Sequence, residues 1–152
     1  MAYLLGIDGG GTGCRAAIAN LDGMILAEAQ GGPANIATNY TDARANIIAA
    51  ATQAAALAGL GAGALAQSSA VLGLAGSNLG DYAARLADDL PFAANEIVND
   101  SIITLEGAIG GVEGCIAAIG TGSVFAARDA NGVRMLGGWG FLLGDDGSGA
   151  RL

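Results

Sequence analysis

The sequence predicts an α/β fold, in which a mixed sheet with flanking helices is followed by the first hairpin of a second lobe. Apolar runs joined by hairpin turns open the chain, segments of strand and helix length then alternate, and a second glycine-rich hairpin comes near residue 120. Four glycines lie between residues 107 and 114, and we place the lobe boundary there. This gives a first lobe at residues 1–108 and the beginning of a second, truncated lobe at residues 109–152.

The first lobe is predicted to begin with three short strands, at about residues 3–8, 14–20 and 24–30. Gly10, Gly11 and Thr12 form the loop between the first two strands, where backbone N–H groups can close on a phosphate because no bulky side chain intervenes. Asp8 ends the first strand, where its carboxylate can hold a hydrated Mg²⁺ beside that phosphate. A plain turn is the alternative interpretation.

The segment that follows the first glycine loop indicates which type of phosphate loop it is. Asp22-Gly23 marks a hairpin turn between two apolar runs, so the glycine loop joins a strand to a strand. The dinucleotide-binding pattern G-x-G-x-x-G fails because Cys14 occupies the place of the third glycine. A P-loop is excluded because the chain contains no lysine.

A second copy of the pattern follows an apolar strand at residues 115–119. Its loop is followed by another apolar strand and by Asn131-Gly132, which is again a hairpin signal. The repetition predicts two related lobes that grip one polyphosphate from opposite sides. The residues of the opposing clamp are Gly120, Thr121, Gly122 and Ser123.

Helices are expected between the later strands. Thr41 is the predicted N-cap of a long alanine-rich helix that ends at about Leu57, and Asn78 is the predicted cap of a second helix that reaches Leu90. Short strands are expected at residues 70–75 and 96–99, and Asp100 opens a helix through Gly107.

Composition limits the classes of function. An acidic chain with a net charge of −8 has no basic face for nucleic acid, and it has no apolar stretch that would span a membrane or act as a signal peptide, so we expect a cytoplasmic protein. The chain has no histidine, so any general base must be a carboxylate. Cys14 and Cys115 are expected to be small buried side chains, with an iron–sulfur site shared between two subunits as the alternative.

Three motifs carry a resemblance to a known family. They are IDGGGT at residues 7–12, IGTGS at 119–123 and GGWGFLLGDDGSG at 137–149. Over residues 5–152 the chain resembles the N-acetylglucosamine kinase and BadF/BadG/BcrA/BcrD-type ATPase family, within the actin/hexokinase/Hsp70-like ATPases. The resemblance implies an actin-like ATPase (ribonuclease H-like) lobe and the N-terminal part of a longer sugar kinase. It implies ATP and Mg²⁺ as cofactors, with N-acetylglucosamine or glucosamine phosphorylated at the 6-hydroxyl.

The resemblance also implies roles for single residues. Asn99-Asp100 matches the family's catalytic pair, so Asp100 is the expected base that accepts the proton of the sugar hydroxyl; a helix cap is the alternative. Asn35 matches a sugar-contacting asparagine, with an Asx-turn as the alternative. The other expected sugar contacts are Gly138, Trp139, Gly140 and Asp145, and Trp139 packing between the lobes is the alternative to its sugar contact.

Two other classes of function stay open at this point. One is an ATPase that activates a reductase or dehydratase, and the other is a non-catalytic sugar-binding lobe. The fragment alone is expected to be inactive, since the residues that bind adenine would lie outside this chain. A homodimer is a further expectation, while the acetylation state of the sugar is left open.

Overall fold

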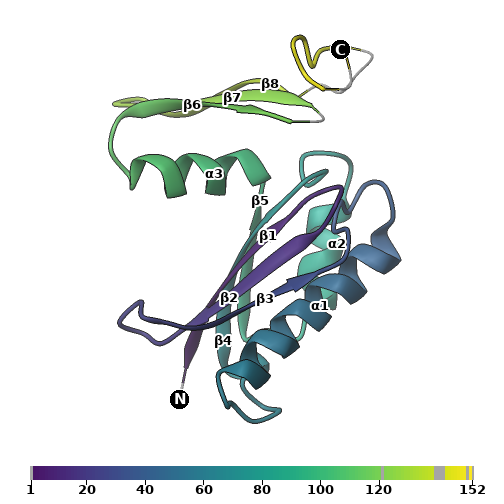
Figure 1. Cartoon of the computed structure of the whole chain (residues 1–152), viewed down its shortest axis with the longest axis vertical. Coiled ribbons are helices and arrows are strands. Elements are labelled where there is room, and N and C mark those ends of the chain that lie inside the picture. The colour runs from purple at the N-terminus through teal and green to yellow at the C-terminus, as the bar shows by residue number, and fades with distance from the viewer. Residues whose placement is uncertain (1, 121, 139–142, 150, 152) are drawn as a thin grey trace. The chain divides into compact units, whose positions relative to one another are not determined.

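The structure is a computed structural model that describes the 152-residue chain except residues 1, 121, 139–142, 150 and 152. It divides into two compact units, residues 1–100 and 101–152 (Figure 1). The sequence predicts a boundary after residue 108, which would leave the helix at residues 100–109 almost entirely in the first unit. In the structure, all of this helix except its first residue belongs to the second unit.

A five-stranded mixed sheet forms the first unit, as the sequence predicts. The strands β1, β2 and β3 make an antiparallel meander, and β4 and β5 pair parallel to β1 in the order β3-β2-β1-β4-β5 (Figure 1). Alternation of buried and exposed residues along β1 and β2 places one face of each strand on the core. The bounds are β1 Tyr3–Gly9, β2 Cys14–Ala19, β3 Ile25–Gly31, β4 Ser68–Leu74 and β5 Ala94–Val98.

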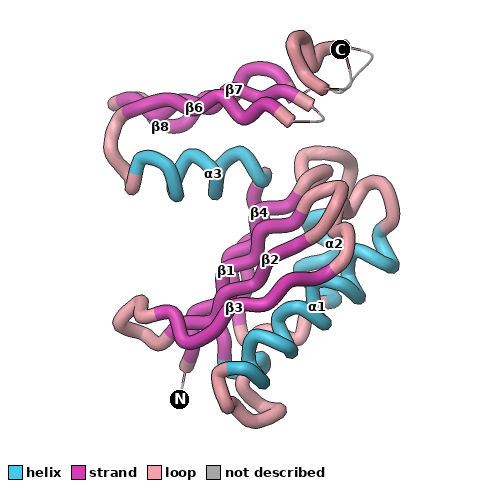
Figure 2. Tube along the Cα trace, viewed as in Figure 1, coloured by secondary structure: helices cyan, strands magenta, loops and turns pink. Residues whose placement is uncertain are grey.

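Helix α1 (Tyr40–Leu57) packs against β1, β2 and β3 (Figure 2), while α2 (Tyr82–Asp89) packs against β5. The buried face of α1 consists mostly of alanine, so the helix lies very close to the sheet. A Cβ added at Gly31, the last residue of β3, would lie 3.0 Å from the Asn46 carbonyl and 3.2 Å from the Ala50 Cβ. A short 3₁₀ helix at Leu65–Gln67 precedes β4.

Both predicted helix caps of the first unit are wrong. Asn39 caps α1 in place of Thr41, because its Oδ1 accepts the N–H of Asp42 at 3.2 Å. The second helix begins at Tyr82 and not after Asn78. Gly80 has a φ of 52°, which a right-handed helix cannot contain, so the segment before it forms turns.

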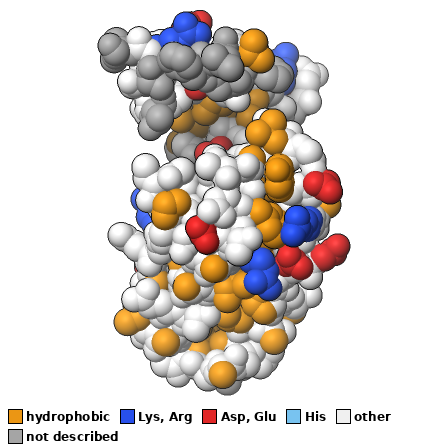
Figure 3. Space-filling model, turned by 90° about the vertical axis from the view of Figure 1, so that its right-hand side faces the viewer, with side chains coloured by type: hydrophobic (Ala, Val, Ile, Leu, Met, Phe, Trp, Pro, Cys, Tyr) orange, Lys and Arg blue, Asp and Glu red, His pale blue; other side chains and the backbone are white. Residues whose placement is uncertain are grey.

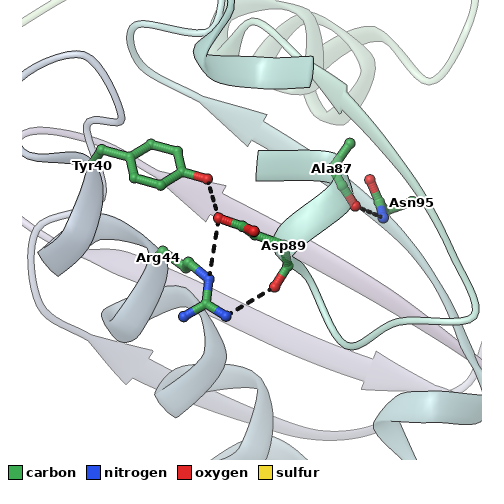
Figure 4. Close-up of polar contacts among 5 residues, drawn as sticks. All are labelled: Tyr40, Arg44, Ala87, Asp89 and Asn95. Carbon is green, nitrogen blue, oxygen red and sulfur yellow. Dashed lines mark hydrogen bonds and ion pairs between the residues drawn. The ribbon is translucent and has the colours of Figure 1, made fainter. Parts of the chain in front are cut away.

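A polar cluster joins the two helices of the first unit (Figure 4). The Tyr40 hydroxyl donates to Asp89 Oδ2 at 2.7 Å, and Arg44 Nη2 donates to the Asp89 carbonyl at 3.1 Å. The Arg85 guanidinium lies 4.2 Å from the centre of the Tyr40 ring, a cation–π contact. The cluster fixes the beginning of α1 to the end of α2.

The second unit contains most of α3 (Asp100–Ile109) and a three-stranded antiparallel sheet, in the order β6-β7-β8. An ion pair between Glu106 and Arg128 joins α3 to β7. The predicted hairpin and its Asn131-Gly132 turn are confirmed. The strands are β6 Gly114–Ile119, β7 Ser123–Asp129 and β8 Gly132–Gly137.

The two cysteines differ, although the sequence predicts that both are buried. Cys14 on β2 is 4% exposed, whereas Cys115 on β6 is exposed. The prediction for Cys115 is wrong because one face of β6 has little cover within its own unit. Exposed and partly buried residues alternate along the strand, and Cys115 lies on the exposed face.

Charged side chains are scattered over the first unit. On the face shown in Figure 3, arginines lie beside acidic side chains and do not gather in one basic patch. Within the described part of the chain, no helix combines the length and the apolar character needed to cross a membrane.

Candidate functional site

The candidate site of the first unit lies at one edge of its sheet. Strands β1, β3, β4 and β5 all run in the same direction, so their carboxyl ends meet at this edge. In open α/β sheets this edge is where ligands bind. Three predicted site residues lie at this edge or follow it: Asp8 near the end of β1, Asn35 in the loop after β3, and Asp100 at the beginning of α3.

Main-chain hydrogen bonds hold these loops to one another. The Gly10 carbonyl accepts the N–H of Ala34 at 2.8 Å, and the Gly9 carbonyl accepts the N–H of Ala75 at 2.8 Å. The Ala75 carbonyl in turn accepts the N–H of Ile36 at 3.2 Å. The loops after β1, β3 and β4 therefore form one connected backbone layer.

The glycines of the first loop serve different purposes. A Cβ at Gly9 would lie 2.7 Å from Leu74 Cδ2, so the fold itself requires glycine there. A Cβ at Gly10 or Gly11 would meet nothing within 4 Å, and neither residue has a positive φ. Neither packing nor backbone conformation explains these two glycines. Open space beside a loop backbone fits the approach of a phosphate, and exposed Thr12 adds a hydroxyl beside it.

Asp8 faces Arg15 across the β1–β2 pair. Its Oδ2 lies 2.6 Å from Arg15 Nη2, and both side chains are largely open to solvent. One accessible carboxylate suits Mg²⁺, which keeps several waters and takes the remaining ligands from substrate phosphates. Asp8 therefore fits a hydrated Mg²⁺, provided that the ion or its waters share the carboxylate with Arg15.

Asn35 forms the Asx-turn that the sequence offers as an alternative to sugar binding. Its Oδ1 accepts the N–H groups of Ala37 at 3.0 Å and of Thr38 at 3.1 Å. Gly76, with a φ of 83°, covers this turn so closely that a Cβ there would lie 2.8 Å from Asn35 Oδ1. A ligand would therefore meet the Nδ2 group of Asn35.

A pocket of about 470 Å³ lies between the first glycine loop and the beginning of α1. Its volume falls within the range of small-molecule sites, about 300–1,000 Å³. The part of the lining that α1 contributes has no signal in the sequence, because the register of the helix against the loops depends on tertiary packing. The lining residues are Gly11, Pro33, Asn35, Thr38, Asn39, Asp42, Ala45 and Asn46.

Asp100 lies where the sequence predicts it. It follows β5 as the first residue of α3, and it is half-buried. The Ser77 hydroxyl donates to the Val98 carbonyl at 3.1 Å, which fixes the loop after β4 to the end of β5 just before Asp100. Asp100 therefore follows the same edge of the sheet as the glycine loop.

The loop of the second unit is closed by its own backbone, since the Gly120 N–H donates to the Gly122 carbonyl at 2.8 Å. A Cβ at Gly120 would meet nothing within 4 Å, as at Gly10 and Gly11. Thr121, Trp139 and Gly140, which belong to the predicted site, lie outside the described residues.

The tail of the second unit contacts this loop. Asp145 Oδ1 accepts the Ser123 N–H at 3.2 Å, and Gly138 donates its N–H to the Ser123 carbonyl at 2.9 Å. The Asp145–Ser123 contact has no signal in the sequence, because no pattern pairs residues 22 positions apart.

The fold is that of an actin-like ATPase. Its marks are the strand order of the first sheet, the glycine loop between β1 and β2, and the second glycine hairpin. Residues 5–152 match the BadF/BadG/BcrA/BcrD ATPase family, and the chain therefore belongs to this family. The resemblance seen in the sequence is confirmed.

Three relatives illustrate the match. A glucosamine kinase from Vibrio cholerae is 37% identical over 99% of this chain and 51% of its own length. An N-acetylmuramic acid/N-acetylglucosamine kinase from Clostridium acetobutylicum is 35% identical over 98% of this chain and 50% of its own length. A crystal structure from Chromobacterium violaceum, provisionally named an N-acetylglucosamine kinase, superposes with a TM-score of 0.92 at 37% identity, over 99% of this chain and 53% of that one. The chain thus spans about half the length of the curated relatives it matches.

Proposed function

We propose that this chain is the N-terminal part of an ATP-dependent kinase that phosphorylates N-acetylglucosamine or glucosamine at the 6-hydroxyl. One observation carries the proposal: a glycine loop with unexplained open space at Gly10 and Gly11 shares a sheet edge with the carboxylate of Asp100. Membership of an ATPase family and the sugar kinases among the relatives support it.

Asp100 is the proposed general base. Its carboxylate accepts the proton of the sugar hydroxyl while the hydroxyl oxygen bonds to the γ-phosphorus and the bond from that phosphorus to the β–γ bridging oxygen breaks, which releases ADP. Gly10, Gly11 and Thr12 bind phosphate, and residues 120–123 form the opposing clamp. Asp8 would hold Mg²⁺ through water, and the ion would supply positive charge beside the phosphates.

The proposed sugar contacts are Asn35, through its Nδ2 group, together with Gly138, Trp139, Gly140 and Asp145. The pocket that joins Gly11 and Asn35 supports a sugar position next to the phosphate loop. A cytoplasmic location, a homodimer and inactivity of the fragment alone stay predictions.

The alternative of an iron–sulfur activator has less support. Cluster ligands are thiolates, and burial raises the pKa of the Cys14 thiol, which favours the protonated form.

The test is Asp100→Asn in the full-length protein. We expect amino-sugar binding to persist and turnover to fall by about 10²–10⁴-fold, the usual contribution of a general base. Isothermal titration measures the binding, and a coupled assay of ADP release measures the turnover.

Asp88→Asn is the matched control, because it removes the same charge from an exposed position on α2. Native turnover in Asp100→Asn would remove Asp100 as the base. Failure of the unaltered full-length protein to phosphorylate either amino sugar would refute the proposed function itself.

A further inference from the structure

The pocket of the first unit carries its charge on one side chain. Asp42, in the first turn of α1, is the only acidic or basic residue among the lining residues that the structure describes. The other lining residues contribute amide, hydroxyl or apolar groups. The Asp42 side chain is exposed to solvent, so its carboxylate is accessible from the pocket. A ligand in this pocket therefore meets a negative charge.

Two arginines close to the pocket in sequence are paired with other carboxylates. Arg44 Nη2 donates to the Asp89 carbonyl at 3.1 Å, and Arg44 Nε lies 3.7 Å from Asp89 Oδ2. Arg15, which follows the glycine loop on β2, lies 2.6 Å from Asp8 Oδ2. Because both guanidinium groups are held in these pairs, neither offsets the charge of Asp42.

The donors at the beginning of α1 are used within its own turn. A helix N-terminus attracts anions through N–H groups that have no partner inside the helix. Here the Asp42 N–H donates to Asn39 Oδ1 at 3.2 Å, and the Thr38 and Asn39 N–H groups donate to the Asn35 carbonyl at 3.3 and 3.4 Å. Asn39 Nδ2 donates to Asp42 Oδ2 at 2.7 Å. The Asp42 carboxylate thus opposes the positive end of the helix dipole, where an anion would otherwise be attracted.

We propose that Asp42 is a specificity-determining residue of the sugar pocket, which sorts amino sugars by charge. It favours a free, positively charged amine and disfavours a carboxylate, each relative to an uncharged amino sugar. The inference rests on the proposed function, within which it narrows the substrate class. Like charges at a binding site suppress the wrong ligand, even where the shape fits. The field of a carboxylate extends over about 8 Å at physiological ionic strength, so it acts without direct contact to the charged substituent.

Asp42→Asn in the full-length protein is the first test. It removes the charge and keeps a side-chain oxygen that can accept the Asn39 amide. Isothermal titration measures the affinities for glucosamine, uncharged N-acetylglucosamine and anionic N-acetylmuramic acid, at a mildly acidic pH where the amine is protonated. Relative to N-acetylglucosamine, glucosamine should bind more weakly and N-acetylmuramic acid more tightly, each by about two- to fivefold, the usual size of an exposed charge interaction. A merely structural role in α1 would change all three affinities by the same factor.

Two further variants change the charge of the same wall. Asp42→Glu keeps the charge and should keep the relative affinities of the three sugars. Ala45 lines the pocket and is exposed on α1, so Ala45→Lys adds a positive charge there. Ala45→Lys should shift the relative affinities in the same direction as Asp42→Asn, and the double variant should shift them further.

Asp22→Asn is the matched control. It removes the same charge from an exposed residue in the turn between β2 and β3, at the opposite end of the sheet from the glycine loop. The relative affinities of the three sugars should stay unchanged in this variant.

Ionic strength gives an independent readout. Raising the salt from about 0.1 M to about 1 M shortens the Debye length from about 10 Å to about 3 Å. The relative affinities of the unaltered protein should therefore approach those of Asp42→Asn in high salt, whereas those of the variant should change little.

The remaining outcomes are also decisive. Unchanged relative affinities in Asp42→Asn, or a shift of all three affinities by one factor, would overturn the proposal. Absent binding of N-acetylmuramic acid in both Asp42→Asn and Ala45→Lys would also overturn it, because shape and not charge would then exclude the carboxylate. Failure of the proposed function is distinguishable, since it shows as absent phosphoryl transfer to either amino sugar by the unaltered protein.

Discussion

The two glycine-rich hairpins share a sequence pattern, but they are held in place by different chemistry. The loop after β1 is fixed by main-chain bonds from neighbouring loops, through the carbonyls of Gly9 and Gly10. The loop after β6 receives a side-chain contact from Asp145, in addition to a main-chain bond at Gly120. A main-chain bond survives most substitutions, whereas a carboxylate contact is lost with one residue. The second loop therefore depends in part on a side chain that one substitution removes, whereas the first loop has no such side-chain contact among those described here.

The largest effect on stability is expected within the first hairpin. Gly9→Ala places a Cβ 2.7 Å from Leu74 Cδ2 and 2.9 Å from the Ala34 Cβ, and such overpacking costs about 1–3 kcal/mol. Gly10→Ala meets nothing within 4 Å and should change stability by no more than about 0.5 kcal/mol. Urea unfolding measures both values.

The same pair separates packing from function. Gly10→Ala should weaken ATP binding while it leaves stability unchanged, because its methyl group occupies the open space at the loop. Equal unfolding free energies for the two variants would contradict the distinction between the two glycines.

A smaller effect is expected where the loop after β3 enters α1. Asn39→Ala removes the side-chain acceptor for the Asp42 N–H and should cost about 1 kcal/mol. Thr41→Ala is the control, since Thr41 lies inside the helix and not at its cap. Thermal unfolding checks the difference, and a larger cost at Thr41 would show that the cap is misassigned.

The smallest expected effect is a difference in chemical labelling between the cysteines of the two hairpins, Cys14 and Cys115. Iodoacetamide at mildly alkaline pH should modify exposed Cys115 in the native protein, and should modify Cys14 only after urea is added. Burial raises the pKa of Cys14, so its contribution to stability is present below the ordinary thiol pKa and is lost as the pH rises through the raised value. Mass spectrometry counts the modified thiols, and rapid native labelling of Cys14 would contradict its burial.

Much of the architecture could be predicted because it depends on local pattern. Alternating apolar residues and Asp-Gly or Asn-Gly turns define the meander and the second hairpin, and these predictions are confirmed. The beginning of α2 could not be predicted, because the positive φ of Gly80 is a property of the folded backbone. Asn39 and Thr41 are both good caps by residue type, and only the path of the chain decides between them.

The site shows the same limit. The glycine loops and Asp100 are visible in the sequence because each lies at the end of an apolar strand. The partner of Asp145 was not visible, because the contact depends on how the tail returns to the sheet. The exposure of Cys115 likewise depends on which face of β6 is covered, and an apolar run does not encode that.

The alanine face of α1 has a mechanical consequence. The helix lies so close to β3 that Gly31 has no room for a methyl group against Asn46 and Ala50. Because a helix is stiff and protein interiors are close-packed, a single added methyl group at this contact would tilt the helix as a rigid rod. The displacement would reach its first turn, which lines the pocket beside Gly11. The spacing between helix and sheet thus sets the width of the pocket, which Asn46 itself lines.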